Sequence, residues 1–249
     1  MEKHIFIIDS FSKAFVNTSI TFENIIIRRN SFNVITGKTG CGKTTLLNLL
    51  GLMDNITKKD KGDVIFNPDH RNNYNYSNLN ANKSKHIRLN YFGFLFQQDH
   101  LFDDMTGWEN VSLPYLVKNP KAKRKEAIEK CKVLIKQYSF HDLLEDNFMQ
   151  RSPATYSGGQ RHRVALLRSL IHDPEVIFAD EPLASVDRNT ALQILRLLDK
   201  QVQDGKTIVM IMHDTMTPLL QNNDIHLNMD KVNIIELSQF VKKNTKEKQ

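Results

Sequence analysis

The chain has 249 residues, of which 40% are hydrophobic and 25% are charged, so its composition excludes a wholly disordered or fibrous protein. Its length predicts one large domain or two small ones, and its longest apolar runs are too short to cross a bilayer. Two cysteines are too few for a disulfide scaffold or a zinc site. The formal net charge of +6 suits nucleic acid or an anionic membrane surface and does not choose between them.

Short apolar runs predict the strands, and the stretches between them predict the helices. Four runs are nearly continuous, as parallel strands covered on both faces should be: residues 32–36, 93–96, 175–179 and 207–212. Residues 188–203 place five apolar side chains on one helical stripe, and Gly205 follows as a stop signal. This alternation of strands and helices predicts an α/β fold with a mainly parallel sheet.

Three polar segments depart from this pattern. Residues 67–85 are rich in Asn and lack apolar periodicity, so we expect a surface excursion there. Residues 118–132 take on helical spacing after Pro120. The charged tail, residues 241–249, is expected to fray.

The strongest motif is GKTGCGKT at residues 37–44, which matches the phosphate-loop pattern G-x-x-x-x-G-K-[ST]. It follows a predicted strand and opens a predicted helix, which is the structural context that the motif requires. Glycines let the backbone N–H groups fold around phosphate oxygens, and the helix dipole adds to their attraction. We therefore expect Lys43 to reach the β- and γ-phosphates and Thr44 to bind Mg²⁺.

A second motif is a buried strand that ends in two carboxylates. Residues 175–179 run directly into Asp180 and Glu181. Such an ending is common by itself, but beside a phosphate loop it indicates a Walker B strand. Asp180 would then bind Mg²⁺ through water, and Glu181 would polarise the attacking water.

A third motif narrows the family. Residues 156–170, YSGGQRHRVALLRSL, place two glycines before an amphipathic helix. With the first two motifs, this segment resembles the signature L-S-G-G-Q of the nucleotide-binding subunits of ATP-binding cassette (ABC) transporters. Tyr156 replaces the leucine of the signature, whereas residues 157–160 keep its remaining four positions.

The resemblance covers most of the chain and implies roles for further residues. Gln97, or its neighbour Gln98, matches the glutamine that touches Mg²⁺ and senses the γ-phosphate. Asp187, in the segment ASVD at 184–187, matches the D-loop aspartate, and His213 matches the switch histidine. Near the N-terminus, Phe15 occupies the place of the aromatic residue that stacks on adenine, with Phe11 as the alternative.

Taken together, the motifs and the resemblance predict three groups of site residues. The catalytic group is Lys43, Gln97, Glu181 and His213. The group that binds ATP is Phe15, Gly37, Lys38, Thr39, Gly40, Cys41, Gly42, Lys43, Thr44, Thr45, Ser157, Gly158, Gly159, Gln160 and Asp187. The group that binds Mg²⁺ is Thr44, Gln97 and Asp180.

The same resemblance implies the domain organisation. We expect a P-loop NTPase with a RecA-like, mainly parallel core sheet, an N-terminal antiparallel β portion and an inserted helical subdomain. Residues 1–98 and 164–249 would form the core, and residues 99–163 the helical signature subdomain. Residues 224–237 resemble the closing strands of the family.

For function, the resemblance implies an ATPase that powers a separately encoded integral membrane permease. Two copies would form a homodimer around ATP at the cytoplasmic face of the plasma membrane, with the permease in the cleft beside Gln97. Residues 46–54 and 93–114 look like the branch of macrolide exporters, lipoprotein-release ATPases and cell-division ATPases, which work by mechanotransmission. We expect no nucleic-acid partner.

Two other functions fit the same motifs. One is a membrane machine that gates a cell-wall hydrolase and transports nothing. The other is an ABC ATPase that acts on nucleic acid or ribosomes, a class that typically carries two cassettes, long coiled coils or zinc insertions.

Overall fold

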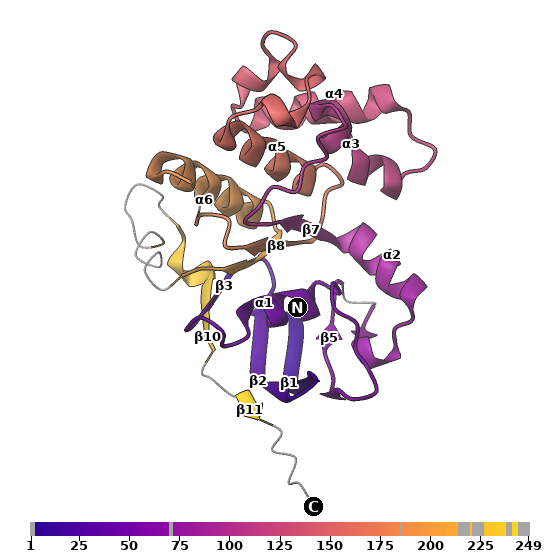
Figure 1. Ribbon diagram of the computed structural model, residues 1–249, viewed down its shortest axis with the longest axis vertical. Coiled ribbons are helices and arrows are strands. Elements are labelled where there is room, and N and C mark those ends of the chain that lie inside the picture. The colour runs from indigo at the N-terminus through magenta and orange to yellow at the C-terminus, as the bar shows by residue number, and fades with distance from the viewer. Residues whose placement is uncertain are drawn as a thin grey trace, which may run out of the picture.

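The computed structural model describes residues 3–69, 72–184, 186–213, 220, 227–237 and 241–243. These residues form two sheets in the lower and central parts of the molecule and a layer of helices above them (Figure 1). No helix in the described ranges is long and apolar enough to span a bilayer. The architecture confirms the predicted class of fold, with a parallel sheet, an antiparallel sheet and added helices.

The antiparallel sheet is built on the long hairpin of β1 (His4–Ala14) and β2 (Thr18–Arg28). Its strand order is β11-β2-β1-β5-β6, and β4 also pairs with β1. The short members are β4 (Lys61–Gly62), β5 (Ile65–Phe66), β6 (Tyr74–Asn75) and β11 (Val241–Lys243). The expectation of a frayed tail was therefore wrong for residues 241–243, whose backbone pairs with β2; residues 244–249 lie outside the described part of the chain.

The second sheet has five strands in the order β10-β3-β9-β8-β7, all parallel. They are β3 (Phe32–Thr36), β7 (Phe92–Leu95), β8 (Val176–Asp180), β9 (Thr207–Ile211) and β10 (Val232–Glu236). Each predicted apolar run lies within one residue of its strand. Because the strands are parallel, the segments that follow them emerge at one edge of the sheet, and this edge carries the predicted motifs.

The helices fall into two groups (Figure 1). Those beside the sheets are α1 (Lys43–Leu50), α2 (Ala81–Tyr91) and α6 (Arg188–Gln203). The upper layer contains α3 (Gly107–Lys118), α4 (Arg124–Gln137), α5 (Gly158–Leu170) and the short turns η2 (His141–Leu144), η3 (Phe148–Gln150) and η4 (Pro153–Thr155). Two further turns are η1 (Tyr76–Asn78) and η6 (Met229–Lys231). The expected domain boundary at residues 163 and 164 falls inside α5, which runs from the upper layer down to the sheet.

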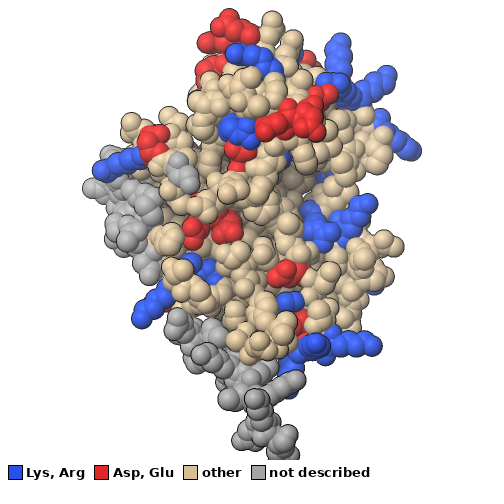
Figure 2. Space-filling model, in the orientation of Figure 1, with Lys and Arg blue, Asp and Glu red and all other residues tan. Residues whose placement is uncertain are grey.

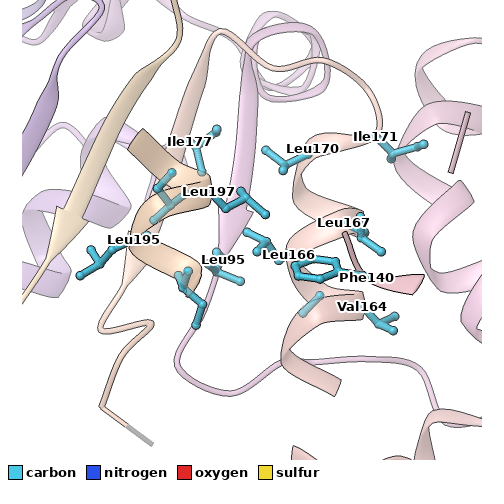
Figure 3. Packing of buried hydrophobic residues seen from close by; sticks show 14 of the residues in the cluster. Leu95, Phe140, Val164, Leu166, Leu167, Leu170, Ile171, Ile177, Leu195 and Leu197 are labelled. Atoms are coloured by element: carbon cyan, nitrogen blue, oxygen red, sulfur yellow. The ribbon is translucent and has the colours of Figure 1, made fainter. Parts of the chain in front are cut away.

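Alternate residues of the parallel strands feed two separate cores. Val176 and Phe178 of β8 pack toward α1 and the antiparallel sheet, whereas Ile177 packs toward α5 and α6. Figure 3 shows the second core, where Leu95 and Ile177 of the sheet lie between Leu166 of α5 and side chains of α6. Both faces of the sheet are thus covered, which explains the nearly continuous apolar runs.

The polar segment at residues 67–85 is more ordered than its composition suggested. It contains β6, η1 and the start of α2, although residues 70 and 71 lie outside the described ranges. Tyr76 is buried, and its hydroxyl donates a hydrogen bond of 2.6 Å to the carbonyl of Leu50. Asn75 and Asn80 accept hydrogen bonds at the starts of η1 and α2. One buried tyrosine and two asparagine caps hold this segment in place. Neither feature places apolar residues at regular spacing, so the sequence pattern did not reveal the order.

Candidate functional site

The phosphate-loop motif forms a tight turn between β3 and α1. Gly37 has a φ of 137°, and a Cβ there would lie 2.7 Å from the carbonyl oxygen of Leu237. Gly42 has a φ of 104° and occupies the N-cap of α1. Side chains at these two positions would be strained or would collide, so the loop needs glycine there. In the described part of the chain no side chain caps α1, which leaves its first N–H groups open to a ligand.

Lys43 lies at the centre of this turn. Its side chain is buried, and Nζ donates hydrogen bonds to the carbonyls of Gly37 at 2.6 Å and Lys38 at 3.3 Å. The loop is therefore wrapped around the ammonium group before any phosphate arrives. Cys41 points the other way: its thiol is buried in the core beside Leu46, so only the backbone of Cys41 can face a ligand.

The carboxylate pair follows β8 at the same edge of the sheet. Burial, together with the neighbouring charge of Glu181, raises the pKa of Asp180, and the ammonium of Lys43 acts in the opposite direction. Glu181 has a φ of 45°, in the left-handed region that non-glycine residues rarely adopt. Its Oε1 lies 3.3 Å from Nε2 of His213, the second residue after β9. The structure thus brings Asp180, Glu181 and His213 together on two neighbouring strands.

The signature residues lie on another part of the molecule. Ser157 caps α5 in a reciprocal arrangement: its Oγ accepts from the backbone N–H of Gln160, and the Gln160 side chain accepts from the Ser157 N–H. A Cβ added to Gly158 or Gly159 would meet nothing within 4 Å. Packing inside this chain therefore does not require these two glycines.

Gln97 shares a cleft with the signature. This cleft has a volume of about 600 Å³, and its walls come from the segment after β7, the start of α5 and the start of α6. The lining residues are Gln97, Gln98, Asp99, His100, Gly158, Gly159, Arg161, His162, Val186, Asp187 and Thr190. No residue of the phosphate loop is among them. One chain therefore divides the predicted site residues between two locations.

Asp187 caps the other helix of this cleft. Its carboxylate accepts hydrogen bonds from Thr190 Oγ1 at 2.6 Å and from the N–H groups of Asn189 and Thr190. The bond from the Thr190 hydroxyl is the main cause of the lowered pKa of Asp187. Ser185 of the same segment lies outside the described residues.

The two aromatic candidates near the N-terminus differ in burial. Phe11 is 0% exposed and belongs to the core below the parallel sheet, so the alternative that placed it on adenine was wrong. Phe15 is 43% exposed at the turn between β1 and β2, where its N–H donates to Thr18. Its ring is available to a ligand.

The sequence analysis did not identify the residues that pack around Tyr156, the first residue of the signature. Tyr156 is buried, and its ring stacks on Phe148 with centroids 4.1 Å apart. The hydroxyl lies 3.0 Å from the carbonyl of Arg151 and 3.2 Å from that of Phe148. Gly107 at the start of α3 makes room for it, since a Cβ there would lie 2.5 Å from Tyr156 Oη. The tyrosine in place of leucine was the available signal, but Gly107, which makes room for its hydroxyl, lies on another helix far away in sequence.

A phosphate loop and a carboxylate pair at one edge of a parallel sheet define a P-loop nucleotide-binding fold. Residues 23–184 match the family model described as ABC transporter. The lipoprotein-releasing system ATP-binding protein LolD of Rickettsia bellii is 36% identical over 210 residues, which cover 84% of this chain and 82% of LolD. The chain therefore belongs to the ABC transporter family, as an ATP-binding subunit, and ATP hydrolysis is the activity of that family.

Two further relatives agree with this assignment. The macrolide export ATP-binding/permease protein MacB of Bartonella henselae is 34% identical over 193 residues, which cover 77% of this chain and only 27% of MacB. A solved dimer of the ATP-binding cassette MJ0796 of Methanocaldococcus jannaschii, bound to ADP and Pi, has a TM-score of 0.71. It is 30% identical in sequence, and the match covers 96% of this chain and 98% of that one. The resemblance to the macrolide-export and lipoprotein-release branch is thus confirmed.

Proposed function

We propose that this chain powers a separately encoded membrane permease by closing as a head-to-tail homodimer around two ATP molecules. The observation that carries the proposal is the division of the site. Lys43, Glu181 and His213 lie at the sheet edge, whereas the open signature glycines lie on a cleft that includes none of them. A second copy can bring its glycines to the phosphates held by the first.

Within one chain, the residues at the sheet edge would perform the phosphoryl transfer. Lys43 and the open N–H groups of α1 neutralise the β- and γ-phosphates. Glu181 orients water and accepts its proton while the bond from the γ-phosphorus to the bridging oxygen breaks. His213 contacts both Glu181 and the departing phosphoryl group. ADP and phosphate are the products, and the positions of these groups provide most of the catalysis.

The residues at this edge also fit a magnesium ion. The hydroxyl of Thr44 and the carboxylate of Asp180 at this edge, together with the amide oxygen of Gln97 from the neighbouring cleft, are hard oxygen donors of the kind that Mg²⁺ prefers. Burial is the main cause of the raised pKa of Asp180, and a bound cation would offset the cost of keeping this carboxylate ionised. When bound, the ion would neutralise charge on the phosphates of ATP. Asp180 would be kept ionised by it, and Thr44 would fix the start of α1 relative to β8.

The signature would act on the ATP of the opposite copy. The first turn of α5 presents backbone N–H groups beside two glycines with open space around them. An anionic phosphate fits such a terminus without displacing side chains. The capping pair of Ser157 and Gln160 fixes this turn in advance.

The surface for the permease would be an apolar groove of about 490 Å³ between α2, β7 and α3, which is beside Gln97 because Phe96, the preceding residue, lines it. Its exposed members include Met53, Phe102 and Val117, which are between 47% and 51% exposed. Lys85 and Arg88 lie at its rim, and no described residue that lines it is Asp or Glu. Figure 2 shows Lys and Arg side chains along the right-hand edge of the molecule, where Figure 1 places α2 and the turn between α3 and α4.

An apolar groove with a basic rim suits an amphipathic segment of a membrane protein. The relatives named for lipoprotein release and macrolide export support a mechanotransmission type of transporter. Attachment through this groove would make the chain a peripheral protein at the cytoplasmic face of the plasma membrane. The cargo would be bound by the permease.

The experiment that tests the proposal uses the Glu181→Gln variant, which retains the shape of the site but cannot accept the proton. With Mg-ATP it should sediment as a dimer, and without nucleotide as a monomer. Adding Gly158→Arg, which fills the open space beside that glycine, should keep it monomeric. A variant that remains monomeric in saturating Mg-ATP would count against the proposal.

The trapped dimer also tests the partner. Affinity purification from native membranes, followed by mass spectrometry, should recover a permease with four transmembrane helices and a large extracytoplasmic domain. A permease of another architecture would overturn the mechanotransmission type. Recovery of a cell-wall hydrolase complex, or of ribosomal or DNA-bound partners without a membrane protein, would overturn the transport role and leave the ATPase chemistry intact.

A further inference from the structure

A charged clamp joins the signature helix to the segment that follows Gln97. The guanidinium of Arg161 binds both carboxylate oxygens of Asp99, with Nε–Oδ2 and Nη2–Oδ1 distances of 2.8 Å. Its third nitrogen donates to Asp103 at 3.0 Å and to the carbonyl of Pro153 at 2.7 Å. All three nitrogens of the Arg161 side chain thus have hydrogen-bond partners, and the pair with Asp99 joins residues 62 positions apart in sequence.

A second arginine of the same helix reinforces this contact. Arg168 donates to the backbone carbonyls of Asp99 at 2.6 Å and His100 at 2.7 Å. The Asp99 carboxylate also accepts from the N–H of Leu101 at 3.0 Å. The segment after Gln97 is therefore held along two turns of α5.

Both members of the clamp also line the cleft that Gln97 shares with the signature glycines. Asp99 is two residues beyond Gln97, and Arg161 is two residues beyond Gly159; all four line the cleft. A bidentate arginine–carboxylate pair fixes both distance and orientation, unlike a single ion pair of lysine. Both side chains are partly buried, at 23% and 20% exposed. Gln97 and the start of α5 are thus constrained to move together.

A neighbouring contact ties the same helix to the catalytic strand. His162 is buried, and its Nε2 lies 2.9 Å from the carbonyl of Pro182, the residue after Glu181. The helix that carries the signature therefore touches both the segment that follows Gln97 and the segment that follows Glu181. Because α5 is a continuous helix of 13 residues, a shift at either contact reaches Gly158 and Gly159.

We propose that Arg161 and Asp99 are positioning residues that make the two ATP sites of the dimer cooperate. ATP in one site would move Gln97, the clamp would move the signature of the same chain, and that signature would tighten on the ATP of the opposite site. This inference rests on the proposed head-to-tail dimer. Neither residue needs to touch ATP, because the effect passes through α5.

The test is the ATP dependence of hydrolysis by the purified chain. For the unaltered protein we expect a Hill coefficient above 1, with an upper limit of 2 for two sites. Asp99→Asn keeps the size of the side chain but removes the negative charge that holds the guanidinium of Arg161. It should lower the Hill coefficient to about 1 while kcat stays within about threefold of the unaltered value.

The matched control is Asp142→Asn. Asp142 pairs with Arg163 of the same helix at 2.8 Å, but it lies on η2, away from Gln97. It should leave cooperativity unchanged even if it lowers the melting temperature as much as Asp99→Asn does. Asp99→Glu, which retains the charge, should restore part of the cooperativity, and Arg161→Lys should behave like Asp99→Asn if the latter does not fold.

The outcomes separate the two hypotheses. Unchanged cooperativity in folded Asp99→Asn, or an equal loss in the Asp142→Asn control, would overturn the role of the clamp and leave the dimer intact. A Hill coefficient of 1 for the unaltered protein, together with a Glu181→Gln protein that stays monomeric in Mg-ATP, would overturn the proposed dimer and the clamp hypothesis with it.

Discussion

Nε2 of His213 lies 3.3 Å from Oε1 of Glu181, and the two residues follow neighbouring parallel strands. The backbone of Glu181 is in the left-handed region, with a φ of 45°. A strained conformation of this kind persists where the surrounding structure holds it, which is common at functional sites. Here the contact joins Glu181, the proposed general base, to the imidazole of His213.

This contact predicts that Glu181 and His213 act as one unit. Glu181→Gln should lower kcat by about 10²- to 10⁴-fold, the usual contribution of a general base. His213→Ala should lower kcat as well, and the double variant should be little worse than Glu181→Gln alone, because coupled residues are not additive. Steady-state phosphate release measures all three. Glu175→Gln, at the opposite end of β8, is the control and should keep full activity; additive losses at Glu181 and His213 would contradict the pairing.

The exposed ring of Phe15 predicts a second, separable effect. Phe15→Ala should weaken ATP binding about tenfold, because stacking of an aromatic side chain on a base is worth about 1–3 kcal/mol. The stability of the fold should change little, since this ring is 43% exposed. Titration with a fluorescent ATP analogue, beside a thermal melt, measures both quantities.

Phe11→Ala is the informative contrast. Phe11 is 0% exposed, so its truncation should destabilise the protein by about 3–5 kcal/mol, while the folded fraction binds ATP normally. An unchanged affinity in Phe15→Ala, measured on fully folded protein, would remove Phe15 from the adenine site.

The close approach of Gly107 to Tyr156 predicts a coupled pair. Gly107→Ala should lower stability by about 1–3 kcal/mol, because the new Cβ would lie 2.5 Å from the tyrosine hydroxyl. Tyr156→Phe removes that hydroxyl and its hydrogen bonds, and should destabilise by about 1 kcal/mol. The double variant should be more stable than the sum of the two losses predicts. Urea unfolding of the four proteins in a cycle gives the coupling energy, and strict additivity would argue against the contact.

Sequence patterns predicted the parts of the fold that depend on neighbouring residues. The apolar run of β3 and the glycines of the phosphate loop report on local backbone geometry, so their positions were predicted to within one residue. The helix α6 was predicted for the same reason, from its apolar stripe. By contrast, α2 contains only Ser84 and Ile87 as buried residues, so no period marked it as a helix.

Contacts between distant segments were not visible in the sequence. The bidentate ion pair of Arg161 and Asp99 joins residues 62 positions apart, and either side chain could equally have faced solvent. The burial of Cys41 was hidden for a related reason, because a tight loop can direct a side chain to either side.

The pair of Arg161 and Asp99 predicts how the stability of the fold depends on pH. Burial by itself would raise the pKa of Asp99, but the hydrogen bonds from Arg161 and from the N–H of Leu101, together with the nearby arginine charges, lower it overall. An aspartate with a lower pKa in the folded state stabilises the protein above its unfolded pKa of about 3.9. That stabilisation is lost as the pH falls through the folded value.

Asp99→Asn should therefore be less stable than the unaltered chain at pH 7, and the difference should shrink as the pH falls below 4. We expect about 1 kcal/mol at neutral pH, because the pair retains some exposure to solvent, which weakens it. Urea unfolding at pH 7, 5 and 3 measures the difference. High salt should reduce it further, since ions in solution screen a pair that is partly exposed. A difference that stays constant down to pH 3 would mean that shape, and not charge, holds Arg161 on Asp99.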